Sequence, residues 1–340
     1  MICQGCLLLT LPNPFKRASP AEHCKMNNLK PIRDVAVVMP AYQAGDTIKR
    51  ALDSIAKQTV APREVIVIDD GSTDGTLEQA MEMSKQLGDT KLIVRRQENL
   101  GPGAARNAAV TNARAQLLAF LDADDEWLPT HLEASLKFFD TTDCTMTCHN
   151  EWLVENGIAT LNDCLARRRE RDSAFVAIYR KGCISTSTVV VRRDHVAACG
   201  GFDPDLANGQ DVDLWLAVLA RDDAKLHAFE DPLSRYFIRP GSIDSHIARR
   251  RKFHQRIAYR WAWRVAVEPD GKLRSVWFRI TAIEYEAVRA HIAAGAYATA
   301  LVSLFRYPIN LVRTTKAAFR RQSLRGNFLS AGDHGPGDVD

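Results

Sequence analysis

The sequence predicts an α/β fold in which a mostly parallel central sheet carries helices on both faces. Short apolar runs, typical of strands buried on both faces, alternate with amphipathic segments of helical period over residues 35–139. The connections are short, which favours right-handed crossovers between parallel strands. Acidic residues directly follow two of the apolar runs, and open α/β sheets bind ligands at the carboxyl ends of their strands. The sequence therefore predicts both a fold class and the edge of the sheet where a site would lie.

Each strand of this first part is followed by a helix start. Asp46 is placed to cap the first helix. A Gly-Ser-Thr-Asp turn at residues 71–74 opens the second helix, and residues 101–103 open the third. Pro129 begins the fourth. The strands are expected at residues 35–39, 64–70, 91–94 and 117–121.

The later part of the chain follows a different pattern. Strands are expected at residues 144–152 and 186–191, and an amphipathic helix at residues 211–219. Residues 153–185 include an Arg-rich stretch for which the sequence predicts no element. After residue 241 the pattern is helical to about residue 325.

Length and charge divide the chain into parts. Its 340 residues exceed the roughly 100–200 of one domain, and 46% hydrophobic with 25% charged residues is typical of a globular protein. Residues 246–325 contain 17 Lys or Arg and 4 Asp or Glu, whereas the rest of the chain contains 28 Lys or Arg and 37 Asp or Glu. This difference in charge predicts that the two parts of the chain have separate roles. We expect a loosely ordered extension at residues 1–33 and a catalytic domain at residues 34–245. A basic, aromatic-rich helical region is expected at residues 246–325, and a disordered tail at residues 326–340.

The eight cysteines lack the paired spacing of a zinc ribbon or a small disulfide framework. Cys3 and Cys6 form a CxxC without a second pair or a surrounding βαβ pattern, which argues against metal or redox chemistry there. A reducing cytosol is therefore the expected compartment.

The run LLAFLDADDEW ends in Asp122, Asp124 and Asp125, at the carboxyl end of a buried strand. Like charges so close together are costly unless a cation joins them, and oxygen ligands suit Mg²⁺ or Mn²⁺, which bridge carboxylates to substrate phosphates. An EF-hand does not fit, because Trp127 stands where that loop needs glycine and Pro129 interrupts it. Capping and solvation before the next helix remain the alternative role for these acids.

The segment GPGAAR at residues 101–106 follows a strand and opens a helix, as a dinucleotide-binding fingerprint does. An NAD-type dehydrogenase therefore remains an alternative function for the chain. Against it, Arg106 replaces the third glycine, and the fingerprint normally lies in the first βα turn. The helix start also suits phosphate oxygens, and Arg106 either neutralises phosphate or pairs with an acid.

Five blocks occur in order: VVMPAYQAGDTIKRALDSI, EVIVIDDGSTDGT, NLGPGAARNAA, LLAFLDADDEW and GGFDPDLANGQDVDLW. Together they resemble the blocks of the family 2 glycosyltransferases, over about residues 35–242. The resemblance implies the GT-A fold, to which the helical C-terminal region would be an appendage. It also implies a nucleotide-diphosphate-sugar donor, a divalent metal (Mn²⁺ or Mg²⁺) and inversion at the anomeric carbon.

The resemblance assigns the nucleobase pocket to Pro40, Ala41 and Tyr42, with Asp70 accepting a hydrogen bond from the base. A carboxylate only accepts, so it favours uracil or thymine, whose ring N3 donates, over cytosine. Guanine also donates through N1, so a guanosine donor stays open although a UDP-sugar is favoured. The alternative is that Asp70 only caps a turn.

The resemblance matches Asp122 and Asp124 to the DxD motif. Asp124 is then the direct metal ligand, Asp122 points to the ribose or the metal, and Asp125 holds both in position. The metal would neutralise the diphosphate as it leaves.

The general base of the family corresponds to Asp211, which would take the acceptor hydroxyl proton on the face opposite the leaving group. Gln210 stands where the family has Glu, which removes a charge beside the base. Asp213 is the rival base, and otherwise an acid on the helix surface. Trp215 is expected in the core rather than against a sugar.

The segment YFIRPGS departs from the family pattern, because Phe237 and Arg239 stand where Arg and His are frequent. Arg cannot bind a metal, so Arg239 is expected to hold the diphosphate, and His246 is the remaining candidate ligand. The QxxRW signature of processive synthases is missing, which favours a single addition.

The basic region contains a cationic run at residues 249–252 and nearby aromatic residues, Tyr259, Trp261, Trp263 and Trp277. Such segments are attracted to anionic membrane surfaces, and none here is apolar enough to span a bilayer. We expect a cytoplasmic protein in peripheral contact with the inner face of the plasma membrane; a packed helical cap is the alternative. No nucleic-acid partner is expected, because no reading motif is present.

The sequence thus predicts an inverting, metal-dependent glycosyltransferase of cell-envelope polysaccharide biosynthesis. It would add one sugar to a glycan or lipid-linked acceptor. The alternatives are a non-catalytic nucleotide-sugar-binding protein and, more distantly, the dehydrogenase.

Overall fold

A computed structural model describes residues 32–164, 173–238 and 247–320. Arg239 and His246 lie outside the described residues, as do residues 165–172 of the Arg-rich region, residues 1–31 of the expected extension and the expected tail.

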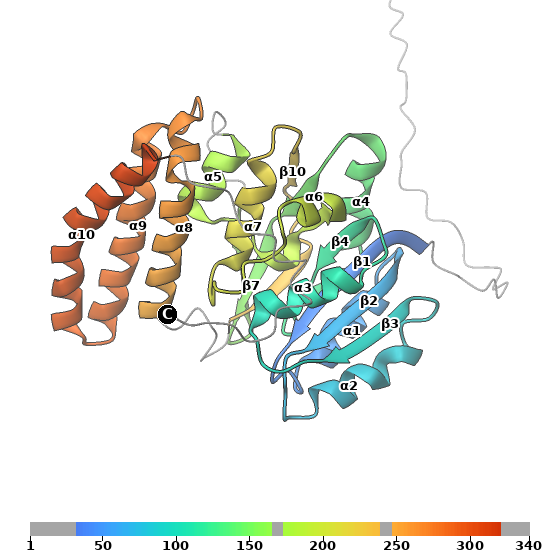
Figure 1. Ribbon diagram of the computed structural model, residues 1–340. Helices are drawn as coiled ribbons and strands as arrows, with labels where there is room; N and C mark the ends of the chain where they lie inside the picture. The colour runs from blue at the N-terminus through green and yellow to red at the C-terminus, as the bar shows by residue number, and fades with distance from the viewer. Residues whose placement is uncertain (1–31, 165–172, 239–246, 321–340) are drawn as a thin grey trace, which may run out of the picture. The chain divides into compact units, whose positions relative to one another are not determined.

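A seven-stranded sheet forms the centre of the fold and is mostly parallel, as predicted (Figure 1). β1 pairs in parallel with β2 and β4, and β2 pairs in parallel with β3. β9 is antiparallel to its neighbours β4 and β6, and β10 is parallel to β6. In spatial order the strands are β10 (Leu226–Phe229), β6 (Met146–His149), β9 (Val190–Arg192), β4 (Leu117–Phe120), β1 (Ile32–Ala41), β2 (Ala61–Asp69) and β3 (Lys91–Arg96).

Helices cover both faces of this sheet because the strands are apolar on both faces. Along β1, Ala36 and Val38 belong to one buried cluster and Val37 and Met39 to another, as the alternation of a strand requires. The first cluster includes residues of α3 and α7, and the second includes residues of α1 and α4. The helices up to this point are α1 (Ile48–Ala56), α2 (Thr76–Glu82), α3 (Pro102–Asn112), α4 (His131–Thr141), α5 (Ala174–Lys181), α6 (Arg193–Ala198) and α7 (Gln210–Leu219).

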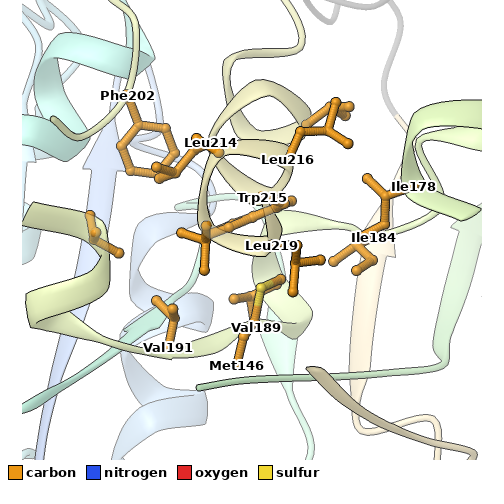
Figure 2. Close-up of a cluster of buried hydrophobic side chains, with 14 of the residues drawn as sticks. Met146, Ile178, Ile184, Val189, Val191, Phe202, Leu214, Trp215, Leu216 and Leu219 are labelled. Carbon is orange, nitrogen blue, oxygen red and sulfur yellow. The ribbon is translucent and has the colours of Figure 1, made fainter. Parts of the chain in front are cut away.

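Trp215 lies in the core, as predicted. Its side chain is fully buried, and its ring meets the edges of Phe120 and Phe202 at centroid distances of 5.5 and 6.1 Å. Figure 2 shows Trp215 and Phe202 among aliphatic side chains from several elements. These aromatic contacts fix α7 against the sheet.

Some predicted boundaries were wrong. Thr47, not Asp46, precedes α1, and it makes no side-chain cap hydrogen bond. Residues 144–152 form two strands, because the chain leaves β6 at Asn150 and joins a second sheet. Residues 186–191 begin with a 3₁₀ turn, Thr186–Thr188, before β9. An apolar run predicts buried backbone, but it does not show where that backbone changes direction.

The second sheet has four strands in the order β5 (Glu126–Trp127), β11 (Ser234–Phe237), β7 (Glu151–Glu155) and β8 (Ile158–Asn162). β11 is antiparallel to β5, with Arg235 opposite Glu126. This pairing brings the segment before residue 239 next to the acids that follow β4.

Three long helices follow: α8 (Ile247–Val267), α9 (Lys272–Ala293) and α10 (Tyr297–Ala318). Within the described residues, none of the helices has the length and apolarity needed to cross a membrane.

A buried ion pair joins α8 to α7. Asp213 is fully buried, and its carboxylate accepts hydrogen bonds from Arg260 Nη1 at 2.7 Å and from Trp261 Nε1 at 2.7 Å. Arg260 Nη2 also donates to Asp203 at 2.6 Å. The prediction that Asp213 is an acid on the helix surface is therefore wrong. Because α8 covers Asp213, a role as the general base in place of Asp211 is also disfavoured.

We expect Asp213→Ala to lower the free energy of unfolding by about 3 kcal/mol, because it leaves the Arg260 guanidinium without one of its two buried partners. Urea unfolding followed by circular dichroism measures the loss. The matched control is Asp205→Ala, which removes an exposed carboxylate near Arg256 and should change the free energy by less than about 0.5 kcal/mol. Equal losses in the two variants would contradict the assignment of this ion pair as a structural link.

Candidate active site

The ends of β1, β2 and β4 bring the predicted donor-binding residues to one edge of the sheet. β1 pairs with β2 as far as Ala41 and Asp69, and with β4 as far as Val38 and Phe120. The residues that follow these strands therefore lie at the same carboxyl edge.

Tyr42 and Asp70 follow two neighbouring strands. The Asp70 backbone N–H donates to the carbonyl oxygen of Ala41 at 2.8 Å, so the two strand ends stay paired. Ala41 is buried, Pro40 is half-buried, and the Tyr42 side chain is 53% exposed. An exposed aromatic ring beside a buried carboxylate can stack on a base while the carboxylate meets its edge.

The Asp70 carboxylate also organises the loop before α3. It accepts hydrogen bonds from Gln97 Nε2 at 2.7 Å, Leu100 N at 2.9 Å and Gly101 N at 2.8 Å. A carboxylate has about four acceptor positions, so roughly one remains for a ligand. Asp70 therefore holds the start of α3 and does not cap its own turn, where Asp69 Oδ1 accepts from the Ser72 N–H at 3.1 Å. Gln97 belongs to this site, and its place in a run of polar residues gave no signal of it in the sequence.

Arg106 pairs with an acid, which is one of the two roles predicted for it. Its Nη2 donates to Asp122 Oδ1 at 2.6 Å, and the Arg106 side chain is only 5% exposed. The guanidinium carbon lies 5.5 Å from the centre of the Phe202 ring. A positive charge thus stands beside the first acid of the DADD run.

The second glycine of GPGAAR, Gly103, allows close packing. A Cβ atom on Gly103 would lie 3.4 Å from the Asp203 carbonyl oxygen and 3.5 Å from Gln210 Cγ. The start of α3 therefore approaches the segment before α7 closely, and this packing accounts for the glycine without a dinucleotide. Gln210 itself is buried.

Asp125 is the buried member of the acidic run. Its Oδ2 accepts a hydrogen bond from Ser187 Oγ at 2.5 Å, and its Oδ1 accepts one from Phe237 N at 3.3 Å. Burial and the neighbouring charges of Asp124 and Asp122 raise its pKa well above the usual range. The three carboxyl groups are thus close enough to interact strongly.

The acidic run suits a divalent cation. Asp122 and Asp124 are both partly exposed, whereas Asp125 is directed into the protein by Ser187. Mg²⁺ and Mn²⁺ take hard oxygen ligands, and one or two carboxylates with substrate phosphates are a common set. Among the described residues, no three His, Cys, Asp or Glu side chains are arranged as a complete metal site. The donor set therefore fits a metal shared with a diphosphate better than a metal held by protein alone.

Asp211 lies in the first turn of α7 and is connected to the acidic run by two consecutive hydroxyl groups. Thr186 Oγ1 donates to Asp211 Oδ2 at 2.7 Å. Ser187 Oγ donates to Asp125 and accepts from the backbone N–H of Asp122 at 3.2 Å. The 3₁₀ turn thus binds the candidate base through Thr186 and, through Ser187, the Asp125 carboxylate and the backbone of Asp122. Thr186 and Ser187 were missed in the sequence, where STST was interpreted as the start of a strand.

Phe237, which departs from the family pattern, contacts a cation. The Arg50 guanidinium carbon lies 3.6 Å from the centre of its ring, and Arg50 Nη2 donates to the Asp124 carbonyl oxygen at 2.5 Å. Arg50 therefore connects the backbone of the DADD run to β11.

An α/β sheet with a candidate base-binding carboxylate and an acidic run at its carboxyl edge is the arrangement expected of an enzyme that uses a nucleotide sugar, and the comparisons with known proteins give a glycosyltransferase. The family described as "Glycosyl transferase family 2" matches residues 36–195. TuaG of Bacillus subtilis, a teichuronic acid biosynthesis glycosyltransferase, is 27% identical over 221 residues, or 65% of this chain and 84% of TuaG. WfgD of Escherichia coli, a UDP-Glc:alpha-D-GlcNAc-diphosphoundecaprenol beta-1,3-glucosyltransferase, is 27% identical over 213 residues, or 62% of this chain and 80% of WfgD.

Two solved structures share the fold. S. aureus TarS 1-349 in complex with UDP-GlcNAc superimposes with a TM-score of 0.56 at 18% identity, covering 84% of this chain and 88% of that one. The mannosyltransferase PcManGT of Pyrobaculum calidifontis, in complex with GDP-Man and Mn²⁺, gives 0.56 at 19% identity, with coverage of 86% and 88%. Residues 36–195 belong to family 2 of the glycosyltransferases, and the protein is a glycosyltransferase with the GT-A fold. Neither the dehydrogenase nor the non-catalytic alternative is supported.

We expect Thr186→Val to lower kcat roughly 10- to 100-fold with little change in KM, because the carboxylate of Asp211 loses the hydroxyl that orients it. Steady-state kinetics of sugar transfer measures both constants. Thr188→Val is the control, since Thr188 Oγ1 donates to the Ser185 carbonyl oxygen in the same turn and touches neither acid. Similar losses of kcat in both variants would show that only the turn matters, and would contradict a positioning role for Thr186.

Proposed function

We propose that this glycosyltransferase moves one sugar from a UDP-sugar to a lipid-linked glycan acceptor, with inversion at the anomeric carbon and a divalent metal. The observation that carries the proposal is the link between Asp211 and the DADD run through Thr186 and Ser187. It joins a group able to take a proton to groups able to hold a diphosphate.

The base-binding end rests on Asp70 and Tyr42. Uracil offers one ring N–H, which matches the single acceptor position that Asp70 retains. Ala41 and Pro40 supply apolar surface beside the ring of Tyr42. WfgD uses a UDP-sugar and the TarS structure contains UDP-GlcNAc, whereas PcManGT binds GDP-Man, so uridine is favoured over guanosine.

At the diphosphate end, Asp124 and Asp122 would hold Mn²⁺ or Mg²⁺. When bound, the metal supplies positive charge that stabilises the departing nucleoside diphosphate. Arg106 holds Asp122 in place, and Ser187 keeps Asp125 turned away from the ligand. Arg239 is proposed to contact the diphosphate as well, from outside the described residues.

At the acceptor end, Asp211 would remove the proton of the attacking hydroxyl as the bond to the anomeric carbon forms. Thr186 orients this carboxylate, and the first turn of α7 places it. Gln210 is buried beside it and carries no charge, so it imposes no repulsion on the carboxylate. WfgD acts on a GlcNAc-diphosphoundecaprenol acceptor, and TuaG is named for teichuronic acid biosynthesis; both point to cell-envelope glycans.

The proposal is tested by transfer from UDP-Glc, UDP-GlcNAc or GDP-Man to a GlcNAc-diphosphate-lipid acceptor, with Mn²⁺, with Mg²⁺ or with EDTA. We expect a product with one added β-linked sugar, formed from a UDP-sugar and absent with EDTA. The NMR coupling constant between the anomeric proton and the proton on the adjacent carbon identifies the anomeric configuration of the product. Retention of the α configuration would overturn inversion, and undiminished transfer in EDTA would overturn the metal.

We expect Asp124→Asn to lower turnover roughly 100- to 1000-fold, because one carboxylate charge that holds the cation is lost. Its urea-unfolding midpoint should stay at the wild-type value, since Asp124 is partly exposed. Asp89→Asn is the matched control, an exposed acid that follows α2 and should retain full turnover. If Asp124→Asn kept near wild-type turnover, the assignment of the metal ligands would be wrong.

A further inference from the structure

Helix α10 has its polarity inverted relative to an ordinary surface helix. The side chains it buries are small or polar, namely Ala300, Ser303, Asn310, Thr314 and Ala318. Many of the side chains it exposes are large and apolar, and those more than half exposed are Tyr297 (69%), Leu301 (54%), Leu304 (55%), Phe305 (73%), Ile309 (53%) and Val312 (54%); Phe319 (74%) directly follows the helix. A surface helix normally directs such residues to the core.

The orientation of α10 is fixed by buried hydrogen bonds to its neighbours. Glu284 of α9 accepts from Asn310 Nδ2 at 3.0 Å and from Arg251 Nη2 at 2.6 Å. Arg251 Nη1 donates to Ser303 Oγ at 2.9 Å, and Tyr259 OH donates to Asn310 Oδ1 at 3.2 Å. Rotating α10 to hide its apolar face would take Asn310 away from the buried carboxylate of Glu284 and Ser303 away from Arg251, which costs free energy. The apolar face is therefore held outward.

Basic side chains border this face. Arg306 and Arg313 are exposed and seven residues apart, so they lie along one side of α10, and the exposed Arg320 follows two residues after the helix ends. Residues 297–320 contain no Asp or Glu. Whatever covers the apolar face therefore meets a row of positive charge without local counter-charges.

Exposed aromatic residues of α9 extend the same surface. Trp277 is 45% exposed and its Nε1 donates to Thr315 Oγ1 of α10 at 3.0 Å. Tyr285, two turns further along α9, is 61% exposed. Trp and Tyr suit the boundary between a hydrocarbon and a polar layer. By contrast, Trp261 is buried against α7, so it cannot serve the membrane contact that the sequence suggested for it.

We propose that α10 lies flat on an anionic lipid surface, with its apolar face at the level of the acyl chains and its arginines among the headgroups. We call the exposed apolar residues of α10, with Arg306, Arg313 and Arg320, the α10 face. Long amphipathic helices with a basic border bind membranes in this way without crossing them. The inference rests on the proposed function only in one respect: a lipid-linked acceptor would be present on the same surface.

A second copy of the chain is the competing occupant, and charge argues against it. Two α10 faces packed together would bring their arginine rows close, with no acid between residues 297 and 320 to pair with them. An anionic headgroup layer supplies the missing negative charge. Lipid therefore satisfies both the apolar and the basic parts of the face.

The test is flotation of the full-length protein with phosphatidylcholine vesicles, with and without phosphatidylglycerol. Wild type should float with the anionic vesicles and much less with neutral ones. The triple variant Leu301→Ser/Phe305→Ser/Ile309→Ser should bind anionic vesicles about 100-fold more weakly. Arg306→Gln/Arg313→Gln/Arg320→Gln should lose about fivefold per arginine, again about 100-fold in all, and lose its preference for anionic vesicles.

Matched control variants distinguish binding through the α10 face from nonspecific binding through exposed apolar or basic residues elsewhere. Met81→Ser/Ile158→Ser/Leu161→Ser removes three apolar side chains that are at least half exposed elsewhere, and Lys85→Gln/Lys91→Gln/Arg95→Gln removes three exposed cations elsewhere. Both should float like wild type. Equal flotation of wild type and the α10 variants, or no flotation of wild type, would overturn the proposal.

Light scattering in solution assigns the alternative. The competing result is that wild type is oligomeric, the apolar α10 variant is monomeric, and neither binds lipid. This result would assign the α10 face to a contact with a second copy and would overturn the membrane assignment. Transfer to a soluble acceptor analogue is measured in parallel and should be unchanged in the α10 variants. Flotation without transfer would reject the proposed function alone, and transfer without flotation would reject the membrane surface alone.

Discussion

The concentration of negative charge at the carboxyl end of β4 is the constraint on which the site depends. Asp125 is buried near the other two acids and would cost several kcal/mol there if it were charged and unpartnered. Arg106 offsets part of this charge at Asp122, and Ser187 and the Phe237 backbone bind Asp125. These partners come from α3, the 3₁₀ turn and β11. The acids therefore require segments far apart in sequence to converge, and the convergence builds the rest of the site.

The same constraint explains why two acids of α7 have different environments. Asp211 and Asp213 are two residues apart, which places them about 200° apart around a helix. Asp211 turns towards Thr186 and the acidic run, whereas Asp213 turns towards α8 and is closed off by Arg260 and Trp261. One carboxylate remains partly exposed and the other becomes a structural ion pair. Attachment of α8 through Asp213 thus also fixes the helix that carries the candidate base.

The parts of the fold that could be predicted are those governed by local pattern. Alternating apolar runs and helix starts predicted the mostly parallel sheet, and ordered blocks predicted the family. Contacts between distant segments left no such signal. Thr186 and Ser187 have ordinary strand neighbours, and Gln97 lies among other polar residues after β3, so only the tertiary structure shows that they bind Asp211, Asp125 and Asp70. A hydroxyl or amide becomes part of a site through its partner, which a single sequence does not contain.

Helix α10 shows the opposite limit of pattern-based prediction. Periodicity alone would turn Leu301, Phe305 and Ile309 inward, because it assumes that the apolar side of a helix faces the protein core. Here the buried carboxylate of Glu284, which is already paired with Arg251 of α8, favours the observed orientation because it also binds Asn310 on the inner side of α10. Small inner residues with hydrogen bonds across the helix contacts are also how helices associate in lipid, where apolar side chains gain nothing by facing inward. The arrangement of α8, α9 and α10 is therefore that of helices adapted to an apolar neighbour on one side, which is the physical reason to look for lipid at α10.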